Sequence, residues 1–574
     1  MHDLVIRGGT IVDGTGSTGY AGDLAIDGGR IAQVGGKAGP GRREVSAAGL
    51  LVTPGWVDVH THYDGQATWD GELAPSSWHG ATTIMFGNCG VGFAPVRREH
   101  HDGLIQLMEG VEDIPGIALA EGLKWDWESF PQYLDALSRL PRVIDVAAQM
   151  PHHALRVYVM GERGIARERA TADDIAAMSR LTEEALRAGA FGFTTSRTES
   201  HRTPTGEAVP ARHAAPDELL GIGEALGRVG RGAFGMVSDF EDEAAEFRWL
   251  SQLARSSGRP VWFLLTDRAY DPERWRRLMA GVREARGQGA QVAAQVAARP
   301  VGVIVGFLGS LNPFTPRPSY AALAQLPPAE RIRRLNQASV REAILREEPS
   351  AQLLDIMTPL QRAITTRWDR IYTLGDPPEY EPDQERSIAA LAARGNRPPA
   401  AVAYDCMLED DGRRMLFFPI TNYVTGDHEP IRQMLSDPAT IVGLSDGGAH
   451  CGMICDASSP TYLLTHWARD RQRGPRLPLE WLVKRQTGDN ARYFGFNDRG
   501  VLAPGKKADF NLIDFAGLRL HAPQIVYDLP AGGRRLVQRV DGYEMTAVSG
   551  RPIFERGQAT GAMPGKLVRA GGRG

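Results

Sequence analysis

The stretch LLVTPGWVDVHTH, residues 50–62, is the part of the sequence that decides the fold. Its apolar run ends abruptly in polar residues, as a buried parallel strand does where its C-terminal end opens into a site. His60 and His62 close the run. Side chains at positions i and i+2 of a strand point to the same side, so both imidazoles can reach one metal ion. An HxH pair alone usually lies on the surface and has no function, but its place after a buried strand favours a pair of metal ligands.

Downstream of this stretch, apolar runs alternate with helical segments. Residues 171–189, TADDIAAMSRLTEEALRAG, are typical of a helix, because Thr171 can cap the first turn and apolar residues recur at three- and four-residue spacing. The strand-like runs stand at 55–60, 81–86, 144–149, 190–195, 233–238, 261–266, 290–296 and 440–445. Eight such runs with intervening helices predict an α/β fold, a (β/α)8 TIM-type barrel, with its site at the C-terminal ends of the strands.

The two ends of the chain have a different pattern. DLVIRGGTIVDG at 3–14 and DLAIDGGRIAQVG at 23–35 are short strands separated by turns, and the DGG at 27–29 indicates a hairpin. Strand patterning returns at 506–515 and 534–557. We therefore expect a small β-sandwich made from residues 1–51 and 496–574 beside a barrel of residues 52–495. The long polar segment 359–399, between the seventh and eighth strands, is predicted to be an insertion over the barrel mouth.

Composition excludes several classes of protein. The net charge is −4 and no basic tract is present, so nothing favours binding to nucleic acid. The N-terminus lacks a basic segment followed by an apolar one, and no run of about 20 apolar residues is free of charge, so we expect neither a signal peptide nor a membrane span. Four cysteines in 574 residues are too few for a disulfide framework. A reducing, cytoplasmic location fits best, and a homo-oligomer is left open.

Two further strand runs end in residues that can bind a metal ion. The second run ends in Gly87-Asn88-Cys89-Gly90, where the glycines indicate a close backbone approach and a thiolate would be a good zinc ligand. A lone cysteine can equally be a small buried apolar residue. The last run ends in SDGGAH, residues 445–450. Asp446 is costly to bury there unless it is paired or bound to metal, although a capping or turn aspartate is the alternative.

These motifs together resemble the amidohydrolase superfamily, and within it the N-acyl-D-amino-acid deacylase branch. The resemblance rests on HTH, GNCGVGFAPV at 87–96, FTTSRTESHR at 193–202, SDGGAH and VLAPGKKADFNLIDF at 501–515. It runs from residue 3 to the end of the chain and includes DLPAGGRRLVQ at 528–538. The combination is specific for the superfamily and branch but not for a substrate.

The resemblance implies a metal-dependent hydrolase that cleaves a C–N amide bond, in an N-acyl D-amino acid or a related small amide. His60 and His62 would hold the metal. Cys89 would take the bridging place that a carboxylated lysine fills in other amidohydrolases. Asp446 would ligate weakly and act as the general base, taking a proton from the attacking water and passing it to the leaving amine.

The sequence departs from the family pattern at the second metal position. The pattern expects a histidine at the end of the fifth strand and another at the end of the sixth. GMVSDFED at 235–242 and WFLLTDRAYD at 262–271 contain none, and Asp239 and Thr266 or Asp267 stand near those places. We therefore expect one zinc ion per chain rather than two, with the ligands His60, His62, Asp446 and Cys89.

Four more residues are candidates for contact with a small-molecule amide substrate. Arg197 and Arg299 can each pair with the carboxylate of an acylamino acid or with a structural acid of the protein. His201 and His450 can each orient the substrate or serve the structure. Two other functions stay open: hydrolysis of a cyclic amide or lactone, and a non-catalytic binding role, which the missing histidines favour and the HTH motif and Asp446 oppose.

Overall fold

The computed structural model describes residues 1–355 and 357–572, and its centre is a ring of parallel strands. One parallel sheet contains β6, β7 and β8, and another runs from β9 through β13 to β17. Thr61 and Gly447 form a parallel bridge where the ends of β6 and β17 meet, which closes the barrel. Each of the eight predicted runs contains a strand of this barrel. The strands are β6 (Trp56–Asp58), β7 (Ala81–Phe86), β8 (Asp145–Ala148) with β9 (Met150–Pro151), β10 (Gly192–Arg197), β11 (Ala233–Ser238), β12 (Val261–Leu265), β13 (Val292–Val296) and β17 (Thr440–Val442).

Side chains of unequal size fill the barrel interior. Trp262 of β12 is completely buried, and a Cβ atom on its neighbour Gly235 would lie 2.3 Å from the indole ring. The small residues Ala147 and Ala293 belong to the same apolar cluster. The Trp262 ring also lies 5.9 Å, centroid to centroid, from that of His60. The packed side chains of the barrel interior therefore lie directly beneath the candidate site.

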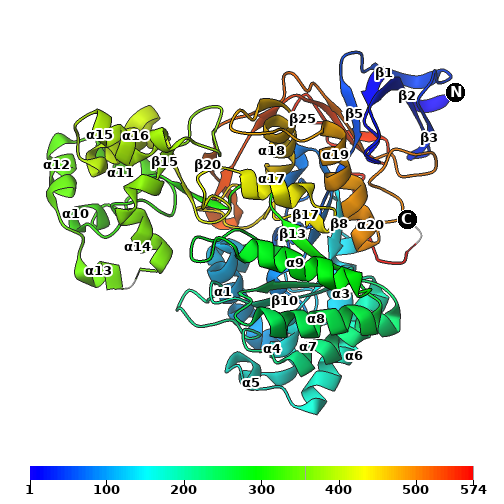
Figure 1. The fold of residues 1–574 in the computed structure, drawn as a ribbon, viewed down its shortest axis with the longest axis horizontal. Coiled ribbons are helices and arrows are strands. Elements are labelled where there is room, and N and C mark those ends of the chain that lie inside the picture. The colour runs from blue at the N-terminus through cyan, green and yellow to red at the C-terminus, as the bar shows by residue number, and fades with distance from the viewer. Residues whose placement is uncertain (356, 573–574) are drawn as a thin grey trace.

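Helices cover the outside of the barrel (Figure 1). The predicted helix is α6, which begins after a capping box made by Thr171 and Asp174 and ends at Gly189, whose φ is 118°. The helices in this part of the chain are α1 (His101–Glu112), α2 (Gly116–Gly122), α3 (Phe130–Ser138), α4 (His152–Met160), α5 (Glu162–Ile165), α6 (Ala172–Ala188), α7 (Pro216–Val229), α8 (Glu243–Ser257) and α9 (Arg274–Gly287). The remaining helices follow β13 and residues 302–419. They are α17 (Glu429–Ser436), α18 (Ser459–Tyr462), α19 (Leu479–Lys484) and α20 (Asn490–Phe494), and π-helical turns lie at Leu463–Asp470 and Arg485–Asp489.

The two ends of the chain share one nine-stranded sheet, which confirms the predicted β-sandwich beside the barrel. The DGG hairpin is present: Asp27 pairs with Arg30, and Gly28 and Gly29 take the positive φ values that such a turn needs. The predicted boundaries at 51 and 495 stay predictions, and residues 573–574 lie outside the described ones. The strands are β1 (His2–Ile11), β2 (Tyr20–Asp27), β3 (Arg30–Val34), β4 (Gly41–Ser46), β5 (Leu51–Pro54), β18 (Phe510–Ile513), β23 (Tyr543–Val548), β24 (Arg551–Glu555) and β25 (Gln558–Ala559).

Part of the C-terminal segment packs elsewhere. β20 (Gln524–Leu529) and β21 (Gly533–Val537) form their own hairpin, and β19 (Arg519–Leu520) pairs with β22 (Val540–Asp541). Leu567 forms a parallel bridge to Val146 of barrel strand β8. The tail thus returns to the barrel after it leaves the nine-stranded sheet.

The insertion between β13 and β17 is larger than predicted. Residues 302–419 form a lobe with a three-stranded sheet, seven helices in its described part, and an apolar core of its own around Phe307, Phe314 and Tyr404. The lobe stands to one side of the barrel in Figure 1, and a place over the barrel mouth stays a prediction. Its elements are β14 (Gly302–Val305), α10 (Pro318–Ala321), α11 (Pro328–Leu335), α12 (Ala338–Arg346), α13 (Ala351–Asp355), α14 (Pro359–Thr366), β15 (Tyr372–Thr373), α15 (Ile388–Arg394), α16 (Pro399–Gly412) and β16 (Leu416–Pro419).

Among the described residues, no helix combines the length and the apolar character that a membrane span requires.

A buried ion cluster ties the barrel to the C-terminal segment. The Asp145 carboxylate of β8 accepts hydrogen bonds from Arg499 Nη1 at 2.5 Å, Lys507 Nζ at 2.8 Å and the Lys566 backbone N–H at 2.8 Å. Asp145 is 2% exposed. Arg499 also pairs with Asp498, and Lys507 also pairs with Asp509, so Asp145 is the buried carboxylate that the two cations share.

Replacing Asp145 with alanine is expected to lower the free energy of unfolding by about 3 kcal/mol, because it breaks a buried ion network in which Arg499 and Lys507 keep only one carboxylate partner each. Chemical denaturation followed by circular dichroism measures the change. Asp135→Ala is the matched control, since its pair with Arg569 also joins barrel and tail but is exposed, and it should cost about 1 kcal/mol or less. Equal small effects in both variants would contradict the assignment.

Candidate metal centre

The ends of three barrel strands bring His60, His62, Cys89 and Asp446 together. The Nε2 atom of His60 lies 3.5 Å from Cys89 Sγ and 3.6 Å from Asp446 Oδ1, and His62 Nε2 lies 3.6 Å from the same oxygen. None of the four residues is more than 7% exposed. The ligand atoms of His60, His62 and Cys89 all lie within 4.8 Å of one another, which is close enough for one zinc ion to bind all three. Three of the four residues predicted as ligands thus form one compact, buried cluster, and Asp446 lies beside its two histidines.

The chemistry of this set fits a zinc ion. Asp446 Oδ1 is buried and has no hydrogen-bond partner. Burial lowers the pKa of His60 to about 4 and that of His62 to about 3, so both rings are neutral, which is the form that binds a metal. Burial and nearby carboxylates raise the pKa of the Cys89 thiol well above its ordinary value. Only a bound cation would hold Cys89 as a thiolate here.

His60 is oriented by a hydrogen bond at its other ring nitrogen, whereas Nδ1 of His62 has no hydrogen-bond partner. His60 Nδ1 lies 2.5 Å from Gln295 Oε1 of β13, so the N–H on Nδ1 donates to the amide oxygen and leaves the Nε2 lone pair free. His62 Nδ1 lies 3.4 Å from Glu112 Oε1 at the end of α1, but the two atoms do not form a hydrogen bond. A carboxylate or amide behind a ligating histidine fixes the ring and raises its basicity. The hydrogen bond from Nδ1 therefore leaves His60 Nε2 to face Asp446 Oδ1, and His62 Nε2 lies at the same distance of 3.6 Å from that oxygen.

Replacing Gln295 with leucine is expected to weaken zinc binding about 10–100-fold, because the His60 ring loses the partner that fixes its tautomer and orientation. Competition with a chelator of known affinity measures the change. Gln486→Leu is the matched control, since Gln486 is also buried and bonds to a barrel carbonyl, that of Val57, rather than to a ligand. Unchanged zinc affinity in the Gln295 variant would show that this contact does not orient His60.

Sequence reasoning missed Glu112. This residue is 1% exposed, and its Oε2 lies 3.6 Å from His450 Nε2. Burial and the charges of Asp446 and Asp64 raise the pKa of the Glu112 carboxyl well above its ordinary value. A signal was present in the sequence: an acid at the C-terminal end of a helix is opposed by the helix dipole, and Glu112 directly follows the buried Val111.

The turn that carries Cys89 depends on its glycines, as predicted. Gly87 and Gly90 have φ values of 81° and 72°, and Cys89 itself has a φ of 55°. A Cβ atom on Gly87 would lie 2.2 Å from the carbonyl oxygen of Gln149. Asn88 Nδ2 donates to two backbone carbonyls of β7 and the HTH segment. The turn is therefore held against its neighbours and aims the thiol at His60.

The places expected for a second metal hold no ligand cluster. Asp239 accepts hydrogen bonds from Thr198 Oγ1 at 2.8 Å and from the Glu199 backbone N–H at 2.7 Å. Asp267 accepts from the Val424 backbone N–H at 3.3 Å. Within residues 1–355 and 357–572, just two groups of three or more ligand-type side chains come close enough to hold a metal, and neither contains these residues or Thr266.

The two predicted substrate arginines have internal carboxylate partners. Arg197 Nη1 donates to Glu246 at 2.6 Å, and Arg299 donates to Asp456 at 2.8 Å from Nη2 and 3.1 Å from Nε. Arg299 also lies 3.9 Å above the ring of Tyr380. Each arginine keeps one buried N–H without a partner, on Nε of Arg197 and on Nη1 of Arg299.

The two predicted substrate histidines lie beside the ligands. His450 Nε2 is 3.8 Å from Asp446 Oδ2, and the His450 side chain is 19% exposed. His201 Nδ1 forms a 2.8 Å hydrogen bond with Ser196 Oγ. Burial, together with the nearby imidazoles of His450 and His62, lowers the pKa of His201 to about 3. His201 and His450 therefore border the ligand set.

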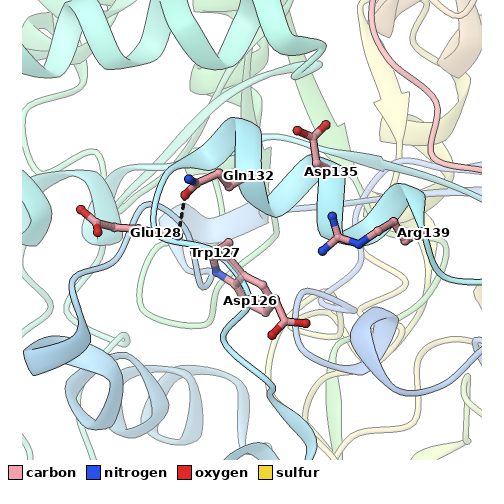
Figure 2. Close-up of a pocket in the computed structure, with 6 residues that line it drawn as sticks. All are labelled: Asp126, Trp127, Glu128, Gln132, Asp135 and Arg139. Atoms are coloured by element: carbon pink, nitrogen blue, oxygen red, sulfur yellow. Dashed lines mark hydrogen bonds between the residues drawn. The ribbon is translucent and has the colours of Figure 1, made fainter.

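Two surface hollows differ in their relation to this centre. One of about 360 Å3 at the start of α3 is lined by Asp126, Trp127, Glu128, Gln132, Asp135 and Arg139, and none of these is a site residue (Figure 2). Another, of about 650 Å3, is lined in part by Glu199, Asp239 and Arg268, which follow the C-terminal ends of β10, β11 and β12. The second hollow opens on the edge of the barrel that carries the ligands.

Comparisons with known proteins agree with this picture. The chain is 28% identical over 575 residues to an N-acyl-D-aspartate deacylase of Alcaligenes xylosoxydans xylosoxydans, covering 99% of this chain and 95% of that protein. It is 25% identical over 577 residues to a D-aminoacylase of the same organism, covering 99% and 97%. The predicted branch of the superfamily is thereby confirmed.

Solved structures of similar proteins share the fold. A D-aminoacylase matches with a TM-score of 0.64 at 23% identity, covering 99% of this chain and 100% of that one. An N-acyl-D-glutamate deacylase from Bordetella bronchiseptica, in complex with zinc and a phosphonate inhibitor, matches with a TM-score of 0.63 at 24% identity, with the same coverage. The family model described as "Amidohydrolase family" matches residues 43–554. The chain therefore belongs to the amidohydrolase family and is a hydrolase of carbon–nitrogen bonds other than peptide bonds.

Proposed function

We propose that this enzyme hydrolyses the amide bond of N-acyl-D-amino acids with a single zinc ion held by His60, His62, Asp446 and Cys89. The observation that carries the proposal is the buried, partnerless Asp446 Oδ1, 3.6 Å from Nε2 of both histidines. The names of the full-length relatives supply the class of substrate. The absence of histidines after β11 and β12 supports one zinc ion rather than two.

The chain's own residues account for the steps of the reaction. A zinc ion in this set would polarise the scissile carbonyl and lower the pKa of water toward about 7. The Asp446 carboxylate takes the proton of the attacking water, since Oδ1 accepts no hydrogen bond from the protein. Asp446 then gives the proton to the leaving amine. His450 lies beside this carboxylate, with its Nε2 3.8 Å from Asp446 Oδ2.

The substrate enters through the hollow beside β10, β11 and β12. His201 and His450 border the reacting end of the substrate. We assign the binding of the substrate carboxylate to Arg197, which ends β10 near this hollow and is held in place by Glu246. Arg299 is 1% exposed and is paired with Asp456 inside the protein. We place the enzyme in the cytoplasm, because all four cysteines are free.

A hydrolysis screen over N-acetyl D- and L-amino acids, with and without added zinc, tests the proposal. Turnover is expected with D-amino acids, should disappear after chelation, and should return with about one equivalent of zinc at the centre. The same screen should include cyclic amides and lactones as substrates. Zinc-dependent turnover of a cyclic amide alone, with no N-acyl amino acid cleaved, would contradict the substrate class while leaving the metal centre intact.

A further inference from the structure

A second group of ligand-type side chains lies where the lobe of residues 302–419 joins the barrel. Glu381 lies in the lobe between β15 and α15, His428 directly precedes α17, and His466 belongs to the π-helical turn that follows α18. Glu381 is 2% exposed, His428 is fully buried, and the His466 side chain is 11% exposed. None of the three belongs to the catalytic set.

The three ligand atoms form a triangle of the size that zinc requires. His466 Nε2 lies 3.1 Å from Glu381 Oε2, His428 Nδ1 lies 3.3 Å from His466 Nε2, and His428 Nδ1 lies 3.9 Å from Glu381 Oε2. The point equidistant from these atoms is about 2.0 Å from each, which is the ordinary Zn–N and Zn–O distance. Two imidazoles and a carboxylate are a common set of zinc ligands.

Groups behind the ligands hold them in the form that binds a metal. His428 Nε2 donates to the Tyr380 carbonyl at 2.9 Å, which leaves the lone pair on Nδ1 facing the triangle. Arg471 donates to Glu381 Oε1 at 3.0 Å and to Oε2 at 3.1 Å. Outer partners of this kind accompany the ligands of most metal sites.

The charged groups around the three ligand atoms are compatible with a bound cation. Burial opposes ionisation of Glu381, but hydrogen bonds from His466 and Arg471 outweigh it and keep the pKa of the carboxyl below its ordinary value. Burial lowers the pKa of His428 well below its ordinary value, so this ring is neutral. Arg471 also lies 4.0 Å from Glu429 Oε2, so two carboxylates share its charge.

We infer that Glu381, His428 and His466 form a second, structural zinc site that fastens the lobe to the barrel. Tyr462 borders the fourth ligand position, since its hydroxyl lies 3.5 Å from His428 Nδ1 and its ring stacks on that of His466. The ligands come from the lobe and from two barrel segments. A bound ion would therefore link segments that are about 47 and 85 residues apart in the sequence.

The alternative is a hydrogen-bonded cluster in which a proton on His466 Nε2 takes the place of the ion. The test uses the full chain with the catalytic centre disabled, as the double variant His60→Ala/Cys89→Ser, loaded with zinc and desalted. Elemental analysis should find one zinc ion per chain. Adding Glu381→Gln or His466→Ala should remove it, whereas adding the surface variant His521→Ala should not. Cobalt in place of zinc should give the visible absorption of a four-coordinate site in the double variant only while Glu381 is present.

Glu381→Gln keeps the shape of the side chain, so it guards against a His466→Ala variant that fails to fold. Chelation should lower the melting temperature of the double variant and leave that of the triple variant with Glu381→Gln unchanged. Less than a tenth of an equivalent of zinc in the folded double variant would overturn the inference, and so would zinc that survives the loss of Glu381 and His466. Neither result bears on the catalytic centre, which these proteins lack.

Discussion

Replacing Asp446 with asparagine is expected to leave the barrel folded and to lower kcat by about 10²–10⁴-fold. The amide keeps the shape of the carboxylate but cannot accept the proton of the attacking water. The fold should survive, because Asp446 has a φ of 48° and asparagine is among the few residues that adopt this conformation readily. The Asp446 backbone N–H still donates to the His60 carbonyl. Initial rates at equal zinc content measure the effect.

Asp113→Asn is the matched control for this substitution. Asp113 also has a positive φ, of 50°, and it holds the loop that follows His450 by accepting from the Gly452 backbone N–H at 2.9 Å. None of the hydrogen bonds described joins Asp113 to one of the four proposed ligands, so Asp113→Asn should retain most of the turnover. A near-normal kcat in Asp446→Asn would show that the base is another group, and Glu112, 3.4 Å from His62 Nδ1, would be the next carboxylate to replace.

His60→Ala and Cys89→Ser are expected to remove zinc from the catalytic centre for different reasons. His60 contributes one of the two imidazoles, and a set of three or four ligands tolerates few vacancies. In Cys89→Ser a hydroxyl replaces the thiol and stays protonated at neutral pH, so zinc affinity should fall by about two orders of magnitude or more. The fold should persist in both variants, because the barrel core lies below the site.

Metal content and melting temperature, measured on the same samples, separate ligation by Cys89 from packing. If Cys89 only packed beneath the site, serine would cost about 1–3 kcal/mol of stability and leave the zinc content unchanged. Cys455→Ser is the matched control, since Cys455 is equally buried and lies outside both ligand clusters. Full zinc content with a lower melting temperature in Cys89→Ser would reject Cys89 as a ligand.

The barrel could be predicted from the sequence because its strands are buried on both faces. Each strand is therefore a short, nearly continuous apolar run, such as ATTIMF at 81–86. The proposed ligands could be found for the same reason, since each polar residue that ends such a run lies at the same edge of the barrel. His60, Cys89 and Asp446 all follow this rule.

The other features of the site and of the lobe depend on contacts between segments that are distant in the sequence. Glu112 reaches the site from the end of a helix, and neither its partner His62 nor its neighbour His450 is close to it in the sequence. The partners of Arg197 and Arg299 lie 49 and 157 residues away. The lobe has its own apolar core, built from short helices whose patterns resemble polar loops when taken singly. No local pattern encodes such pairings.

Anomalous diffraction at the zinc edge, from crystals of the active enzyme, tests the central claim most directly. The account predicts one peak at the catalytic centre, about 2.0–2.3 Å from His60 Nε2, His62 Nε2, Cys89 Sγ and an oxygen of Asp446. A peak beside Glu381 would belong to the separate structural site. Two peaks at the catalytic centre, or none in crystals that retain full activity, would contradict the claim that a single zinc ion held by these four residues carries out the hydrolysis.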